Sequence, residues 1–151
     1  MTRTAAREMA VRLCYGLSEN PRDPEEALDE FFESEYYATL SKEDELYESE
    51  PDERQTEYIR RLVKGSADHG AELDGYIEKY TVGWKFSRIS RTALAVIRIA
   101  MYEVLYMQDE VPPRAAITEA VALAKKYEEP ETVPFVNGVL GSFVRGEVGE
   151  K

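Results

Sequence analysis

Two arginines near the start of the chain, Arg3 and Arg7, have the residue type and spacing that bind phosphate groups. Residues four apart share one face of a helix, and "TAAREMAVRLCYGL" (residues 4–17) has the apolar spacing of one. Cations at a helix N-terminus oppose the helix dipole, but a bound phosphate would meet both guanidinium groups and the free N–H groups of the first turn. The alternatives are solvated arginines on a loose terminus, or a pair with Glu8.

Three further side chains have residue types that bind ligands. Arg98 lies in the most apolar segment, "VIRIAMY", where a buried guanidinium needs a partner. It either forms an internal salt bridge, with Glu103 or Glu119 as candidate acids, or reaches a ligand at the edge of a groove. Phe135 begins the last apolar segment. Its ring is either a core contact or an exposed platform on which a base could stack. Tyr15 fits ordinary helix packing with its hydroxyl at the surface.

The usual residue patterns of catalysis are absent from the sequence. It has no nucleophile beside a base and no phosphate-binding glycine loop, and its one histidine, His69, has neither a second His nor a Cys nearby. We therefore expect a protein that is not an enzyme, with no metal and no cofactor. Cys14 is the only cysteine, which excludes an internal disulfide and suits the reducing cytoplasm. No apolar run approaches the ~18 residues of a membrane span.

The negative charge of the chain is concentrated in one segment. The net charge is −11, but residues 23–57 contain fifteen acidic and two basic residues, a net −13. The remainder has fifteen acidic and seventeen basic residues and so carries +2. Because the local field decides whether phosphates bind, the overall acidity does not exclude a nucleic-acid partner.

The elements that position these residues are all predicted to be helices. Asp23, Pro24 and Glu26 form a helix start, with an N-cap, a proline in the first turn and a capping-box acid. Further apolar stripes of helical spacing begin near residues 54, 73, 88, 114 and 134, and residues 40–53 read as an acidic loop or a frayed helix. The fold class is therefore all-α, a compact domain of about seven helices over residues 1–151.

The last helix contains Asn137-Gly138, a pair that is typical of hairpin turns. The flanking apolar residues, however, come as doublets spaced by four, in "PFVNGVLGSFV", and this spacing is helical rather than extended. Glycine costs about 1 kcal/mol relative to alanine inside a helix. We expect Gly138 and Gly141 to offset that cost by allowing another helix to approach closely.

Together these motifs resemble one known family. "VIRIAMYEVLY", "VPPRAAITEAVALAKKY" and "PFVNGVLGSFV" are similar to the C-terminal half of the transcription antitermination factor NusB, and "AAREMAVRLCYGL" is similar to its first helix. The motifs occur in the family's order, while residues 23–57 carry no such match. The resemblance implies an all-helical fold of two small helical bundles and a role without catalysis.

The resemblance also implies partners and site residues. NusB proteins bind the boxA element of nascent ribosomal RNA as a single strand, together with the ribosomal protein NusE, in a complex that keeps RNA polymerase elongating. Arg3 and Arg7 then correspond to the arginine-rich RNA-binding stretch, and Phe135 to the phenylalanine of "FVNG" at the RNA-facing edge. Arg98 corresponds to the arginine of the family's "LR" position and is a further expected RNA-binding residue. Tyr15 corresponds to a tyrosine near the NusE surface.

Two alternatives stay open at the level of the sequence. The N-terminal stretch has Thr4 and Ala5 where many family members show arginines, so the chain could be a helical module that binds a NusE-like protein without significant RNA binding. The surface of the first helix could also serve a homodimer.

Overall fold

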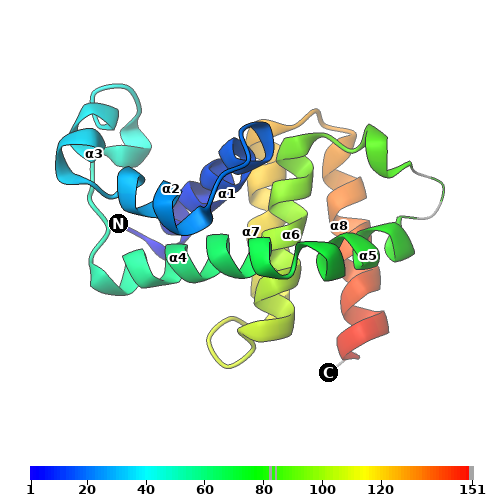
Figure 1. Ribbon diagram of the computed structural model, residues 1–151. Coiled ribbons are helices and arrows are strands. Elements are labelled where there is room, and N and C mark those ends of the chain that lie inside the picture. Colours follow the sequence, from blue (N-terminus) through cyan, green and yellow to red (C-terminus); the bar gives the residue numbers. More distant parts are fainter. Residues whose placement is uncertain (82, 84, 150–151) are drawn as a thin grey trace. The chain divides into compact units, whose positions relative to one another are not determined.

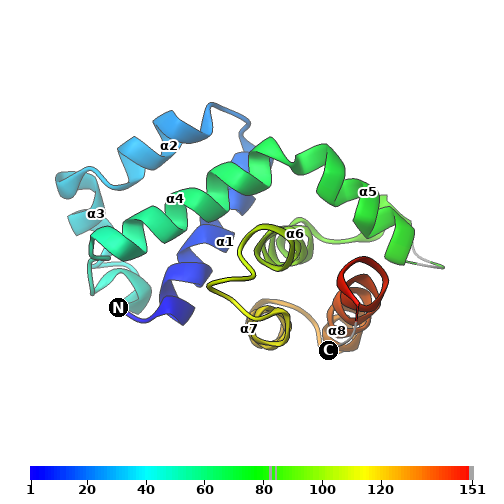
Figure 2. The same cartoon turned by 90° about the horizontal axis from the view of Figure 1, so that it is seen from below.

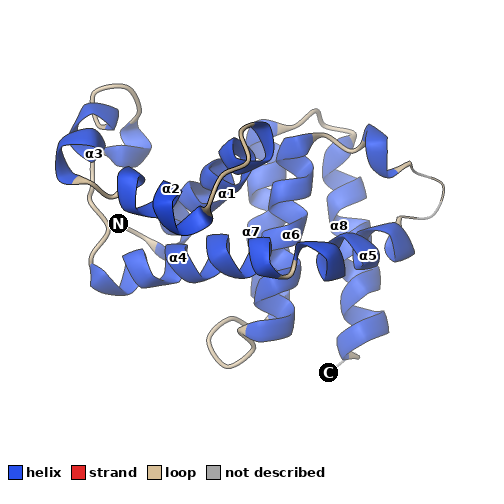
Figure 3. Cartoon of the chain, viewed as in Figure 1, coloured by secondary structure: helices blue, strands red, loops and turns tan. Residues whose placement is uncertain are grey.

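The computed structural model describes residues 1–81, 83 and 85–149, and in this part of the chain every regular element is a helix (Figures 1 and 3). The prediction of an all-α fold is confirmed. The α-helices are α1 (Arg3–Glu19), α2 (Pro24–Phe31), α3 (Ser34–Leu40), α4 (Glu53–Asp68), α5 (Gly70–Tyr80), α6 (Arg91–Tyr106), α7 (Pro113–Tyr127) and α8 (Thr132–Phe143). Short turns of helix occur at η1 (Glu45–Tyr47), η2 (Phe86–Arg88) and η3 (Val144–Val148).

The chain divides into two compact units, Met1–Ala67 and Asp68–Lys151. Unit 1 contains α1 to α3 and nearly all of α4, and unit 2 contains α5 to α8. Each unit is described here by itself. The organisation of residues 1–151 as a single domain stays a prediction.

In unit 1, polar side chains set where the helices begin. The Thr2 hydroxyl accepts a hydrogen bond of 3.0 Å from the Ala5 amide, which places the start of α1 at Arg3. The Asp23 carboxylate accepts one of 3.3 Å from the Glu26 amide, and Pro24 follows as the first helical residue. The predicted start of the second helix is therefore confirmed.

The acidic segment forms more structure than the sequence suggested, because aromatic residues anchor it. Residues 34–40 form α3, which the sequence patterns did not separate from α2, and residues 41–52 are a loop with one helical turn. The rings of Phe31, Tyr37 and Tyr47 pack edge to face, with centroids 5.7–5.9 Å apart. The Tyr37 hydroxyl donates to the Ser49 carbonyl oxygen at 2.9 Å, and the Asp44 carboxylate accepts from Arg12 at 2.8 Å.

Unit 2 is a three-helix bundle crossed by a fourth helix. Figure 2 shows α6, α7 and α8 nearly end-on at the corners of a triangle, and Figure 1 shows α5 lying across α6 and α8. Every residue of the range 93–104 on α6 is buried except Arg98, as expected for a helix that is apolar on nearly all sides. The core of this unit therefore sits around α6.

Asn137 and Gly138 lie inside α8, as the doublet spacing predicted, but the expected reason for the glycines was wrong. A Cβ atom at Gly138 would meet no atom within 4 Å, and one at Gly141 would meet only the side chain of Arg145. Neither glycine is therefore needed for the approach of another helix. Gly146 instead leaves space for the ring of Tyr80 on α5, because a Cβ there would lie 2.8 Å from the Tyr80 Cζ atom.

Replacing Gly138 with alanine is expected to stabilise the protein. Alanine restricts the unfolded chain and favours the helix by about 0.5–1 kcal/mol, and the new methyl group has open space. The midpoint of thermal unfolding, followed by circular dichroism, should rise by about 1–4 °C. Gly146→Ala is the matched control and should lower the midpoint, because Tyr80 must move. A lower midpoint for Gly138→Ala would contradict the expectation.

Candidate nucleic-acid interface

Arg3 presents its guanidinium group on the ring of Tyr58 in unit 1. The Arg3 Cζ atom lies 4.4 Å from the ring centroid, within the range of a cation–π contact. Arg3 itself is exposed, while Tyr58 is buried on α4. The ring therefore holds a positive group at the first turn of α1, where the unpaired N–H groups of the helix also favour an anion.

Arg7 lies beneath this exposed position. It is only 4% exposed, and its Cζ atom lies 5.7 Å from the centroid of the same Tyr58 ring. The two arginines, which were expected to share one face of the helix, therefore differ in exposure: Arg3 is accessible and Arg7 is buried. A direct phosphate contact by Arg7 stays a prediction, and its burial near the Tyr58 ring favours a role in packing that ring.

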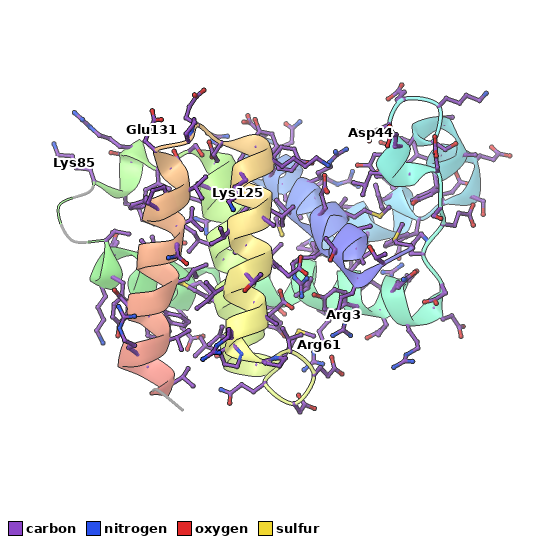
Figure 4. The ribbon with its side chains drawn as sticks, turned by 180° about the vertical axis from the view of Figure 1, so that it is seen from behind. Arg3, Asp44, Arg61, Lys85, Lys125 and Glu131 are labelled. Carbon is purple, nitrogen blue, oxygen red and sulfur yellow. The ribbon has the colours of Figure 1, made fainter. Side chains whose placement is uncertain are left out.

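The sequence patterns missed Arg61, which lies three residues after Tyr58 on α4. Residues three apart on a helix are neighbours on its surface, so Arg61 belongs to the side of α4 that carries the Tyr58 ring. It is partly exposed, and Figure 4 labels it together with Arg3. Only the fold could show that Arg61 belongs with Arg3, because the two arginines are 58 positions apart in the sequence.

In unit 2, Phe135 occupies the first turn of α8 and is partly exposed. The exposed residues Asn137 and Gly138 follow it, so the surface beside the ring is small and polar. Lys125, at the end of α7, lies at the same end of the bundle, with Glu131 at the start of α8 (Figure 4). The charge near Phe135 is therefore mixed, and its ring is the feature best suited to contact a base.

Arg98 makes an internal salt bridge, with a partner that the sequence did not indicate. Its Nε and Nη2 atoms donate to the two carboxylate oxygens of Asp74 on α5 at 2.7 and 3.0 Å. This bidentate pair joins α5 to α6 and uses the geometry in which arginine binds carboxylates best. The Arg98 side chain is 24% exposed, and a contact with RNA stays a prediction that this pairing disfavours.

Tyr15 is among the exposed large side chains, at 39% exposure on the second half of α1. Gly16 beside it is also exposed, and the side chains of Leu13 and Leu17 line a groove of about 540 Å³ toward Phe31 on α2. This surface has the mixture of an aromatic ring and aliphatic side chains that protein interfaces favour. The partner-binding role of Tyr15 stays a prediction.

The described residues contain no group of three His, Cys, Asp or Glu side chains placed to hold a metal ion. His69 is the residue before α5, at its N-cap position, with its Nδ1 atom 3.2 Å from the Glu72 carboxylate and its ring centroid 4.3 Å from that of Tyr106. Among the described helices, none is long and apolar enough to cross a membrane. The geometry thus offers binding surfaces for an anion, a base and a partner protein.

Comparison with known proteins agrees with the sequence motifs. A protein-family model, that of the NusB family, matches residues 4–145. The chain belongs to the NusB family. The transcription antitermination protein NusB of Acetivibrio thermocellus is 39% identical over 145 residues, which is 96% of this chain and 90% of that protein. The family resemblance predicted from the sequence is therefore confirmed.

Solved structures of the family share the fold. NusB of T. maritima superposes with a TM-score of 0.77 at 25% identity, covering 96% of this chain and 92% of that one. A chain from a crystal structure of the antitermination factors NusB and NusE in complex with double-stranded RNA gives a TM-score of 0.76 at 24% identity, covering 95% and 96%. The fold of this chain is thus that of the family.

Proposed function

We propose that this chain is a transcription antitermination factor that binds boxA-type single-stranded RNA of ribosomal RNA transcripts together with NusE. The proposal rests on membership of the NusB family, whose model matches residues 4–145. It also rests on a relative, 39% identical, that is named for transcription antitermination. The role is non-catalytic, acts on the RNA polymerase elongation complex only indirectly, and places the protein in the cytoplasm.

Each unit supplies one kind of RNA contact in this proposal. Unit 1 offers the Arg3 guanidinium on the Tyr58 ring, where a phosphate releases its counterions on binding. Unit 2 offers the Phe135 ring, which is suited to stack on an unpaired base. NusE adds further surface, so joint binding exceeds the affinity of either protein alone.

Replacing Arg3 with glutamine is expected to weaken binding of boxA-type RNA without loss of fold, since Arg3 is exposed. The slope of log affinity against log salt should become shallower by about 0.7, the value of one phosphate contact on a single strand. Fluorescence anisotropy of a labelled RNA at several salt concentrations, with and without NusE, measures both effects. A scrambled RNA tests whether the bases are read.

Arg22→Gln is the matched control, because it changes the net charge equally in the same unit but removes an exposed ion pair with Glu30. In the titrations without NusE, its RNA affinity and salt slope should equal those of the unchanged protein; the comparison is made there because Arg22 lines the groove beside Tyr15. Equal losses in both variants would mean that only net charge matters. No preference for boxA-type over scrambled RNA, with or without NusE, would contradict the proposal.

A second candidate is a protein-interaction module that binds a NusE-like protein without significant RNA binding. The exposed Tyr15 beside the groove on α1 favours it. Co-purification with NusE, lost in Tyr15→Asp, together with equal indifference to boxA-type and scrambled RNA, would select this function.

A further inference from the structure

Unit 2 contains a cleft that the contacts described above do not use. It lies between the start of α7 and the end of α8 with η3, and has a volume of about 670 Å³, a size typical of ligand sites. Its apolar walls come from Pro113 and Ile117 on α7 and from Val144 and Val148 in η3. We call it the α7–α8 cleft.

The charge of the α7–α8 cleft is opposite to that of the chain. Arg114 and Arg145 line it, and none of its lining residues among those that the structure describes is acidic, although the net charge of the chain is −11. Within residues 1–81, 83 and 85–149, neither of these guanidinium groups forms an ion pair. The groove in unit 1 differs, because its arginines Arg12 and Arg22 are paired with carboxylates. The α7–α8 cleft therefore suits an anion with an apolar or aromatic part.

The guanidinium group of Arg145, a residue of η3, is held at the wall of the cleft by residues at the end of α8. Its Nη2 atom donates to the Ser142 hydroxyl at 3.3 Å. Its Nη1 atom lies where a Cβ at position 141 would be only 3.2 Å away, so Gly141 leaves the space that the guanidinium uses. This contact explains why a glycine stands at position 141, which the packing of helices did not explain. An arginine placed in this way loses less freedom when it binds an anion.

We propose that the α7–α8 cleft binds one nucleotide of single-stranded RNA, with the phosphate on Arg114 and Arg145 and the ribose and base against the apolar walls. Planar guanidinium groups bind phosphate through paired hydrogen bonds. The inference rests on the proposed function, because RNA is the anion for which the family membership argues.

The position of the cleft on α8 favours RNA over a peptide carboxylate. Arg145 follows Phe135 by ten residues, which is about 15 Å along a helix. A few nucleotides of an extended strand cover that length, so one RNA strand can reach both the Phe135 ring and the cleft. An isolated peptide carboxylate would use the cleft without Phe135.

The test compares the affinity of boxA-type RNA for Arg114→Gln, Arg145→Gln and Gly141→Ala with that for the unchanged protein. Each arginine variant should bind several-fold more weakly, with a salt slope shallower by about 0.7. Gly141→Ala should fold normally yet bind more weakly, because its methyl group displaces the Arg145 guanidinium. Arg88→Gln is the matched control, since Arg88 is exposed in the same unit, carries the same charge and lies outside the cleft.

The outcomes separate this inference from the proposed function. If the unchanged protein does not prefer boxA-type RNA, the proposed function fails first. If Arg3→Gln and Phe135→Ala weaken binding but the cleft variants match Arg88→Gln, only the cleft inference is overturned. A separate NMR experiment follows the amide signals of Ile117, Val144 and Val148 during titration with RNA or peptide. Shifts caused by a short peptide with a free apolar C-terminus, but not by the RNA, would also overturn it in favour of a peptide carboxylate.

Discussion

Replacing Phe135 with alanine is expected to weaken binding of boxA-type RNA by about 5- to 150-fold. Stacking of an unpaired base on an aromatic ring contributes roughly 1–3 kcal/mol, and the ring of Phe135 is partly exposed on the first turn of α8. The charge around it is mixed, so the ring and not the local field should account for most of this contribution. The salt slope should stay unchanged, because no phosphate contact is removed.

Two further substitutions at this position separate stacking from simple contact. Phe135→Tyr keeps an aromatic face and should retain most of the affinity, whereas Phe135→Leu keeps the apolar volume without the ring and should bind nearly as weakly as Phe135→Ala. Anisotropy titrations measure the affinities, and circular dichroism verifies that each variant is folded. Wild-type affinity in Phe135→Leu would contradict base stacking and would point to a purely structural function of the ring.

The helices could be predicted because their signals are local. The N-cap hydroxyl of Thr2, the Asp23-Pro24 start of α2 and the apolar doublets of α8 each act within about one turn of helix. The short helix α3 was missed, since its position depends on the packing of Tyr37 against Phe31 and Tyr47. These contacts are made through the tertiary structure and leave no periodic trace in the sequence.

The candidate site could be predicted only in part, because the residue types are visible in the sequence but their partners are not. Spacing placed Arg3 and Arg7 on one helix, but it could not show that the exposed and the buried arginine both lie near the ring of Tyr58. The acid that pairs with Arg98 is Asp74, 24 positions away on another helix. Likewise, Arg114 and Arg145 line one cleft only because α7 and α8 are antiparallel neighbours.

Phe143 lies two turns after Phe135 on the same helix and should show the opposite behaviour. Its side chain is fully buried, and the rings of Tyr76 and Tyr80 on α5 pack on it edge to face, with centroids 5.3 and 6.0 Å away. Phe143→Ala removes these contacts and leaves a cavity, so the free energy of unfolding should fall by about 3–5 kcal/mol. Denaturation with urea, followed by circular dichroism, measures the loss.

Phe143→Leu is the control for cavity size and should lose markedly less stability, because most of the apolar volume stays. At low temperature, where each variant is still folded, the affinity of Phe143→Leu for boxA-type RNA should equal that of the unchanged protein. Since Phe135 and Phe143 share α8, this pair of substitutions separates the RNA-binding function of the helix from its packing function. A loss below about 1.5 kcal/mol in Phe143→Ala would mean that α5 does not depend on this ring for its packing on α8.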